Sequence, residues 1–320
     1  MDTLVTFIMG LPCPVGVLTP VSTFLSSKKI ITSPNLLMQM HSIVYVAIAY
    51  HIVFLVSQWI LFPPLVRLRF ACEKPENDKK PETKVDDEIK QADLVNQSAV
   101  HFVSLVQSLV ILYLSLSYLS GHGRSTHPTP ESRVFSQSPK TDVVCVFAVG
   151  YFVWDALISV MYSSFPFVLH GVVSMVMFSI GLQPYIQYYA PAFLLFELSN
   201  PFLNFRWFGI KYLPQVSDRN HSFVARVCNA LQLANNVILM LVFLLARIVW
   251  GWLKIGELCY DFFQVRNDPR FRPLETAVIV AGNLTLDVLN VVWFSTMLGV
   301  AKRIVSKRGR VQDKPVTEAH

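Results

Sequence analysis

Polar and ionisable side chains inside otherwise apolar runs are the residues of this sequence that could carry chemistry. The densest group lies in the run PAFLLFELSNPFLNFRWF, residues 191–208. Glu197, Asn200 and Asn204 are spaced i, i+3 and i+7, so they share one face of a helix. Arg206 follows near the end of the same run. Such a face can hold a polar headgroup, or it can bond neighbouring helices to each other, and the sequence leaves both uses open.

Asp155 and His170 form a second candidate pair. They lie in the runs GYFVWDALISVMY and PFVLHGVVSMVMF, on either side of the short turn at 163–166. An antiparallel hairpin would bring the two side chains together. A buried carboxylate beside a histidine fixes the tautomer of the imidazole and orients it as a general base. The alternative is a hydrogen bond that only joins the two helices.

Three other apolar runs also carry polar residues. His101, Ser104 and Gln107 in HFVSLVQS follow an i, i+3, i+6 pattern, which predicts a polar stripe facing inward. The remaining candidates are Arg247, Asp287 and Asn290 in the last two runs, and Asn283 precedes Asp287 by four residues. Arg247 or Arg206 is the expected partner of Glu197.

These side chains need helices to position them, and the composition indicates that the helices cross a membrane. Only 15% of the 320 residues are charged and 53% are hydrophobic, against roughly 25% charged in an ordinary soluble domain. This composition excludes a disordered chain and argues against a soluble enzyme. Seven apolar runs contain only four charged residues; they are 41–62, 98–119, 143–162, 166–182, 184–204, 230–252 and 276–299.

Each run is about long enough to cross the ~30 Å hydrocarbon core of a bilayer as a helix. Helices are expected because backbone hydrogen bonds in lipid must be satisfied within the segment. The sequence therefore predicts an all-α membrane protein with about seven transmembrane helices.

The remaining segments divide the chain and orient it. We expect an irregular or interfacial lead-in over 1–40, a first transmembrane helix over 41–62, a flexible charged loop over 63–97, a helical domain over 98–303 and a basic tail over 304–320. Seventeen Lys and Arg residues fall on the side of the charged loop and the tail, and nine on the other side. This bias predicts a cytosolic C-terminus.

Soluble-enzyme and metal-site motifs are absent from the sequence. It contains no G-x-x-x-x-G-K-[ST], H-E-x-x-H or G-x-S-x-G, and its five cysteines form no C-x-x-C. We predict no metal site, no cofactor and no nucleic-acid partner, since the basic residues flank the apolar runs instead of forming a stripe in a soluble domain.

The segments HFVSLVQS, GYFVWDALISV, FELSNPFLNFRWF and LNVVWF, together with a histidine near the start of the fourth run, resemble the TLC-domain family. This family of multi-pass membrane proteins is related to the ceramide synthases, and the resemblance covers about residues 96–303. It looks most similar to the uncharacterised fungal-type TLC-domain proteins. The resemblance implies six helices around a central lipid-accessible cavity, one further helix in front of them, and a location in the endoplasmic reticulum.

One departure from the family affects the expected function. Ceramide synthases carry adjacent histidines, but here His170 is followed by Gly171, while the carboxylate of the preceding helix is kept as Asp155. The resemblance thus implies a protein that binds or senses membrane lipids and contributes to lipid homeostasis. An acyltransferase that uses acyl-CoA, with Asp155 and His170 as catalytic residues, is the alternative. A receptor or chaperone for membrane proteins is a weaker one.

Overall fold

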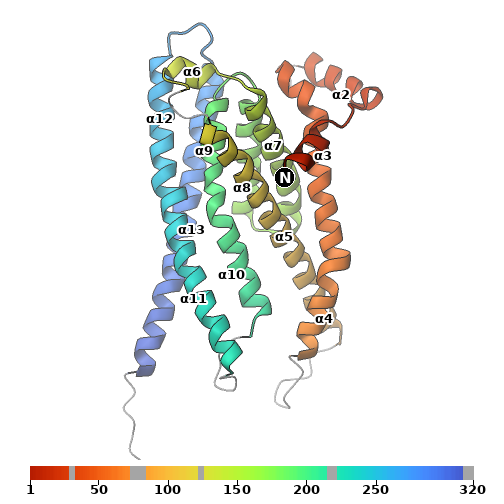
Figure 1. The fold of residues 1–320 in the computed structure, drawn as a ribbon, viewed down its shortest axis with the longest axis vertical. Coiled ribbons are helices and arrows are strands. Elements are labelled where there is room, and N and C mark those ends of the chain that lie inside the picture. Colours follow the sequence, from red (N-terminus) through yellow and green to blue (C-terminus); the bar gives the residue numbers. More distant parts are fainter. Residues whose placement is uncertain (29–32, 73–83, 122–125, 215–221, 313–320) are drawn as a thin grey trace, which may run out of the picture.

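The computed structural model describes residues 1–28, 33–72, 84–121, 126–214 and 222–312 (Figure 1). Every regular element within these ranges is helical. In chain order the elements are α1 (Asp2–Met9), α2 (Val15–Ser27), α3 (Pro34–Val56), η1 (Ser57–Leu61), α4 (Phe62–Cys72), α5 (Lys84–Gly121), α6 (Pro130–Phe135), α7 (Pro139–Tyr162), α8 (Phe165–Gly181), η2 (Gln187–Tyr189), α9 (Ala190–Phe193), η3 (Leu194–Ser199), α10 (Asn200–Tyr212), α11 (Phe223–Phe243), η4 (Leu244–Val249), α12 (Trp250–Gln264) and α13 (Pro273–Gln312).

Several helices begin where a Ser or Thr precedes a proline. The Ser33, Thr129 and Ser138 side chains each accept a hydrogen bond from a backbone N–H in the first turn of α3, α6 and α7. In each case the next residue is a proline, whose missing N–H costs nothing at the first helical position. These local signals set the helix starts independently of the apolar pattern.

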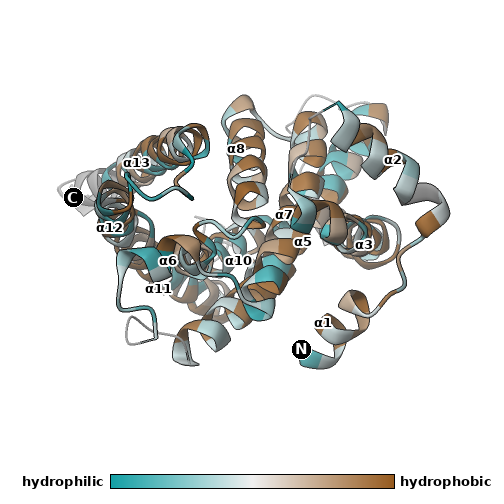
Figure 2. Cartoon of the chain, turned by 90° about the horizontal axis from the view of Figure 1, so that it is seen from above, coloured by the Kyte–Doolittle hydropathy of each residue, from teal (hydrophilic) through white to brown (hydrophobic). Residues whose placement is uncertain are grey.

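Five helical segments are long and apolar enough to cross a membrane. They are Pro34–Ala71, Val85–Gly121, Pro139–Tyr162, Phe223–Gln264 and Pro273–Arg303, and Phe165–Gly181 is a shorter apolar helix. Large apolar side chains such as Val160, Met161 and Val288 are 59–70% exposed, and Figure 2 shows hydrophobic residues on the outer as well as the inner faces of the helices. A helix that is apolar all round fits a lipid environment. The predicted all-α membrane fold is confirmed.

The segment predicted as a single helix over 184–204 is broken, so that prediction was wrong. After an irregular turn the chain forms the short helices η2, α9 and η3, and only α10 is a regular α-helix of several turns. Pro201 lies in the first turn of α10. A proline there cannot donate to the carbonyl four residues earlier, so the helix cannot continue smoothly backwards through Glu197.

The helices also extend further than the apolar runs, which corrects the predicted lead-in, loop and tail. The predicted lead-in over 1–40 contains α1, α2 and the start of α3, and α13 continues into the predicted tail. The predicted loop over 63–97 is helical at both ends, as α4 and as the first turns of α5, while residues 73–83 lie outside the described residues. Charged residues favour water, but they do not prevent a membrane helix from continuing beyond the bilayer.

α7 lies at the centre of the bundle and packs against α3, α5 and α8. The end of α4, the end of α10, the start of α11 and the end of α13 lie at one end of the molecule, at the bottom of Figure 1. The helix α6 and the end of α12 lie at the opposite end.

An ion pair at that opposite end fixes α6 on α12. Arg133 donates to both carboxylate oxygens of Asp261 over 2.6 Å, and the two side chains are 2% and 0% exposed. The Tyr189 hydroxyl also donates to Asp261. These hydrogen bonds raise the pKa of Arg133, so the guanidinium remains charged. The pair connects α6, α12 and the start of the broken segment.

We expect Asp261→Asn to destabilise the fold by about 3–5 kcal/mol, because it leaves the buried Arg133 without its counter-charge. Thermal unfolding of the purified protein in detergent would show this as a lower Tm. Asp268→Asn is the control, since it breaks an ion pair with Arg270 in which the arginine is 60% exposed and should leave Tm unchanged. Equal effects of the two substitutions would contradict the structural role of Arg133 and Asp261.

Candidate functional site

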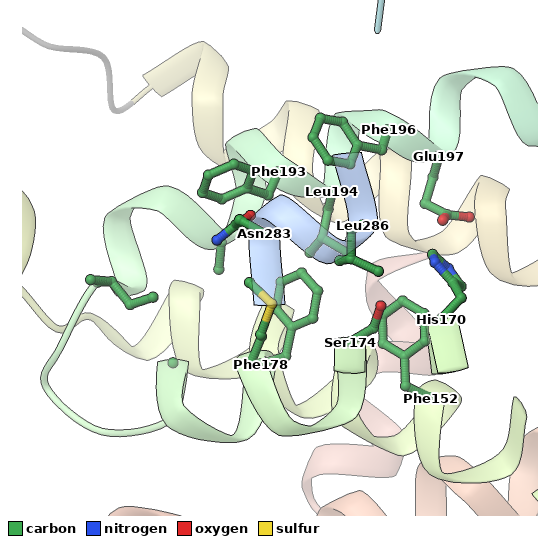
Figure 3. Close-up of a pocket in the computed structure, with 14 residues that line it drawn as sticks. Phe152, His170, Ser174, Phe178, Phe193, Leu194, Phe196, Glu197, Asn283 and Leu286 are labelled. Carbon is green, nitrogen blue, oxygen red and sulfur yellow. The ribbon is translucent and has the colours of Figure 1, made fainter. Parts of the chain in front are cut away.

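A cavity lies between α7, α8, the broken segment 187–199 and α13 (Figure 3). The space open to the centre of a water-sized molecule is about 50 Å³. The wall is mostly apolar, with Phe152, Met177, Phe193 and Leu286 among the lining residues. These side chains come from four different parts of the chain, so the cavity exists only when the bundle is assembled.

Glu197 and His170 form the polar end of this cavity. Figure 3 shows the Glu197 carboxylate and the His170 ring pointing toward one another at one end, with the aromatic residues extending away from them. Glu197 is 5% exposed, and one of its oxygens accepts a 2.5 Å hydrogen bond from Asn200. The Nδ1 atom of His170 is buried and has no hydrogen-bond partner among the described residues. A buried polar atom without a partner is unusual, and a ligand group could satisfy it.

Arg247 supports this polar end from behind. Its guanidinium donates to the Phe196 carbonyl over 3.1 Å and to the Ser199 hydroxyl over 2.8 Å. It also donates to the side-chain oxygens of Asn200 over 2.7 Å and Asn290 over 3.3 Å. Among the described residues, Asn200 bonds to both Arg247 and Glu197 and so links them. The expected direct pair of Glu197 with Arg247 or Arg206 is not formed, and the break in the helix separates Asn204 from the face that the spacing predicted for Glu197, Asn200 and Asn204.

A second polar cluster connects α10 with α5. The Asn204 oxygen lies 2.8 Å from Nδ1 of His101, and its amide nitrogen donates to Ser104 over 3.3 Å. The His101 ring also stacks on Trp207, with ring centroids 4.2 Å apart. Asn204 is fully buried, and these contacts use its amide to hold α10 against α5.

The other predicted site residues lie apart from the cavity. The Gln107 oxygen accepts from Tyr50 on α3 over 2.8 Å, and Arg206 donates to Asn236 on α11 over 2.7 Å. Asp287 is 2% exposed and packs against Gly251 of α12, with one oxygen unpartnered. The structure thus divides the predicted set among several helix contacts.

Asp155 and His170 lie on neighbouring helices, but the described residues include no hydrogen bond between them. The Asp155 carboxylate instead faces the next residue of α8: a Cβ placed on Gly171 would lie 2.9 Å from its oxygen Oδ2. Tyr151 donates weakly to the other oxygen over 3.5 Å. α7 therefore leaves no room for a side chain at Gly171. The assignment of Asp155 and His170 as a catalytic pair stays a prediction.

Three polar residues at the site were not among the predicted binding or catalytic residues. Ser174 and Asn283 line the cavity, and Ser199 accepts from Arg247. Ser174 follows His170 by four residues, so helical spacing alone could have placed both on one face. Nothing in the sequence signals the role of Ser199, which depends on the break in the helix.

We expect Gly171→Ala to destabilise the protein by roughly 1–3 kcal/mol, as other overpacked sites do. The added Cβ would lie 2.9 Å from Asp155 and 3.2 Å from the backbone of Ala156, and a backbone cannot move aside cheaply. Gly256→Ala in α12 is the control, because nothing lies within 4 Å of its Cβ position. Its Tm in detergent should stay the same or rise, and a similar fall in both variants would contradict the close contact of α7 and α8.

Known proteins are similar in sequence to this chain over most of its length. Residues 97–299 match the family model of the TLC domain. An uncharacterised TLC domain-containing protein of Saccharomyces cerevisiae is 52% identical over 315 residues, which cover 96% of this chain and 97% of that protein.

More distant relatives match a smaller share of the chain. An uncharacterised TLC domain-containing protein of Schizosaccharomyces pombe is 30% identical over 207 residues, covering 63% of this chain and 64% of the relative. TLC domain-containing protein 4-B of Danio rerio is 30% identical over 182 residues, covering 52% and 62%. No solved structure matches the chain. With its helical membrane-type fold and this sequence match, the chain belongs to the TLC domain family.

Proposed function

We propose that this protein is a multi-pass membrane protein of the endoplasmic reticulum that binds a lipid in its central cavity and so contributes to membrane lipid homeostasis. The observation that carries the proposal is an apolar cavity with one polar end, formed by Glu197 and His170. An amphiphile with a hydrocarbon chain and a single polar group has the matching distribution of polarity.

The wall of the cavity favours a hydrocarbon chain. Aromatic and aliphatic side chains from α7, α8, α9, η3 and α13 provide most of the lining. Water in such a space would find few hydrogen-bond partners, whereas a hydrocarbon chain needs none. The cavity is therefore suited to the chain of a lipid.

The polar end favours a ligand group that donates hydrogen bonds. The Glu197 carboxyl group has oxygens that accept hydrogen bonds, and a hydroxyl, amine or amide of a lipid is a suitable donor. His170 provides a ring nitrogen without a protein partner at the same end. Arg247 donates its hydrogen bonds to neutral oxygens of the protein. Among the described residues no cation is bonded directly to Glu197, so this end of the cavity does not favour a phosphate group.

Acyl transfer from acyl-CoA is the second candidate, because His170 lines the cavity and could act as a base. The two candidates differ in the product: only the transferase forms a new ester or amide. Incubating the purified protein with labelled acyl-CoA and membrane lipids, with His170→Ala as comparison, separates them. Labelled product that disappears in His170→Ala would establish the transferase.

We expect Leu286→Trp to reduce the lipid that co-purifies with the protein by several-fold, because the larger indole fills the cavity that Leu286 lines. Leu284→Trp is the matched control on the same helix, where the leucine is 42% exposed. Mass spectrometry of lipids extracted from the two purified variants gives the comparison. Equal lipid content in both variants would contradict binding in the cavity.

Glu197→Gln should change which lipid is bound more than how much is bound. The amide keeps the size of the side chain but also donates, so the preference for a hydroxyl or amine should weaken. The same mass spectrometry, comparing lipid classes in Glu197→Gln and the wild type, checks this. An unchanged distribution of classes would remove Glu197 from the polar end of the site.

The predicted orientation can be tested separately. An excess of Lys and Arg, seventeen against nine, lies on the side of the C-terminal tail, which supports a cytosolic C-terminus. We expect an epitope at the C-terminus to be accessible to antibody after the plasma membrane alone is permeabilised, with staining of the endoplasmic reticulum. A signal that requires full permeabilisation would contradict this orientation.

A further inference from the structure

A second hollow lies away from the central cavity, between α4, α10 and α11. The space open to the centre of a water-sized molecule is about 440 Å³. It is formed by apolar and aromatic side chains that come from all three helices: Phe62, Leu65, Phe205, Phe208, Tyr212 and Leu231. We refer to these six residues as the lateral groove.

The floor of the lateral groove is aromatic and its edges are open. Phe62 stacks on Phe208 with ring centroids 5.8 Å apart, which connects α4 to α10. At the edges, Leu65 is 43% exposed and Leu231 is 63% exposed. An open apolar groove on the outside of a membrane bundle is in contact with lipid chains, so a chain can lie along it without entering the protein.

The three helices of the groove carry basic residues and no acidic ones. Within their described lengths the charged side chains are Arg67, Arg69, Arg206, Lys211 and Arg226. All three helices reach the same end of the molecule, at the bottom of Figure 1, which is the end predicted to face the cytosol. Among the described residues near this end, the acidic ones lie on α5, between 86 and 93.

Two of these basic residues are close to groove residues. Arg69 follows Leu65 by four residues, so it continues the same face of α4, and it acts electrostatically on the Tyr212 hydroxyl. Lys211 lies next to Tyr212 in the sequence and its ammonium is 5.9 Å from the centre of the Trp207 ring. The apolar groove thus ends in positive charge at the level where headgroups would lie.

An unpartnered acceptor gives an independent indication of a ligand. The side chain of Gln232 lies on Gly209, where a Cβ would be in contact with its amide, and both residues line the hollow. In the part of the chain that the structure describes, the buried Gln232 oxygen Oε1 has no hydrogen-bond partner. A donor in a lipid headgroup, such as the ammonium of phosphatidylserine, would satisfy this acceptor.

We propose that the lateral groove is a binding site for a glycerophospholipid with an anionic headgroup. One acyl chain lies along the aromatic floor, and the phosphate lies among the basic residues of α4, α10 and α11. This site differs from the central cavity in its chemistry, because the polar end of the cavity is a carboxyl group and that of the groove is basic. The inference therefore does not depend on the proposed function.

The test reconstitutes the purified full-length chain in vesicles of equimolar phosphatidylcholine and phosphatidylserine. The protein is then re-extracted gently, and native mass spectrometry measures the ratio of the two lipids that remain bound. For the wild type we expect several-fold enrichment of phosphatidylserine over the vesicle ratio. A ratio equal to that of the vesicles would mean that only surrounding bulk lipid is retained, and would overturn the proposal.

Two pairs of variants locate the enrichment. Leu231→Trp fills the groove and should abolish it, whereas Leu233→Trp, at a residue that is 45% exposed on the same helix but does not line the groove, should preserve it. The double variant Arg69→Gln and Lys211→Gln should reduce enrichment several-fold, and Lys254→Gln with Arg266→Gln in or just after α12 should not. Enrichment that survives Leu231→Trp and the double variant would overturn the proposal.

Leu286→Trp in the central cavity provides the last comparison. It should leave the phosphatidylserine enrichment unchanged even though it removes lipid from the cavity. Loss of enrichment in Leu286→Trp, with no loss in Leu231→Trp, would assign the anionic lipid to the central cavity instead.

Discussion

The guanidinium of Arg247 is 5% exposed inside an apolar helical bundle, and it has to find hydrogen-bond acceptors there. It finds them on two other segments: the Phe196 carbonyl, Ser199 and Asn200 on the broken segment, and Asn290 on α13. The Phe196 carbonyl is available because, at the end of the 3₁₀ helix η3, the Asn200 N–H donates to the Glu197 carbonyl instead. Arg247 itself lies in the π-helical turn η4. Two irregular turns thus meet around one buried cation.

This arrangement determines where Glu197 lies. Asn200 bonds to Arg247 on one side and to Glu197 on the other, so the carboxyl group is held at the wall of the cavity without a direct ion pair. The same segment provides Phe193, Leu194 and Phe196 to the apolar wall. The break in the helix therefore serves both the polar end and the apolar length of the cavity.

Hydropathy in the sequence predicted the class of fold well, because lipid-facing and buried helices are both apolar and charged residues collect outside them. It also identified Glu197, Asn200 and Arg247 as polar residues in costly positions. Hydropathy could not predict the break at 194–199, since the run over 184–204 has the same hydropathy whether its helix is continuous or broken. Pro201 does predict a kink at Glu197. The sequence does not predict that the Phe196 carbonyl accepts from Arg247, which lies about fifty residues further along the chain.

Side-chain direction was the other feature that the sequence did not contain. A short turn between α7 and α8 brings Asp155 near the second helix, but the carboxylate meets Gly171, while His170 faces the cavity. His170 and Gly171 are adjacent in the sequence, but on the helix they point in different directions, so Asp155 meets one and not the other. In the same way, Gln107 lies in one stripe with His101 and Ser104 by spacing, yet it bonds to Tyr50 on α3 while the other two bond to Asn204.

The cavity and the lateral groove would divide lipids by charge, the first through a carboxyl group and the second through basic residues. The central claim is that a lipid occupies the cavity with its polar group at Glu197 and His170. The most direct measurement is an experimental structure of the full-length protein extracted from its membrane with no lipid added. We expect elongated density along Phe152, Phe193 and Leu286 whose polar end lies within hydrogen-bond distance of Glu197 or His170. A cavity closed by its own side chains, or a ligand whose polar group lies at the opposite end, would contradict it.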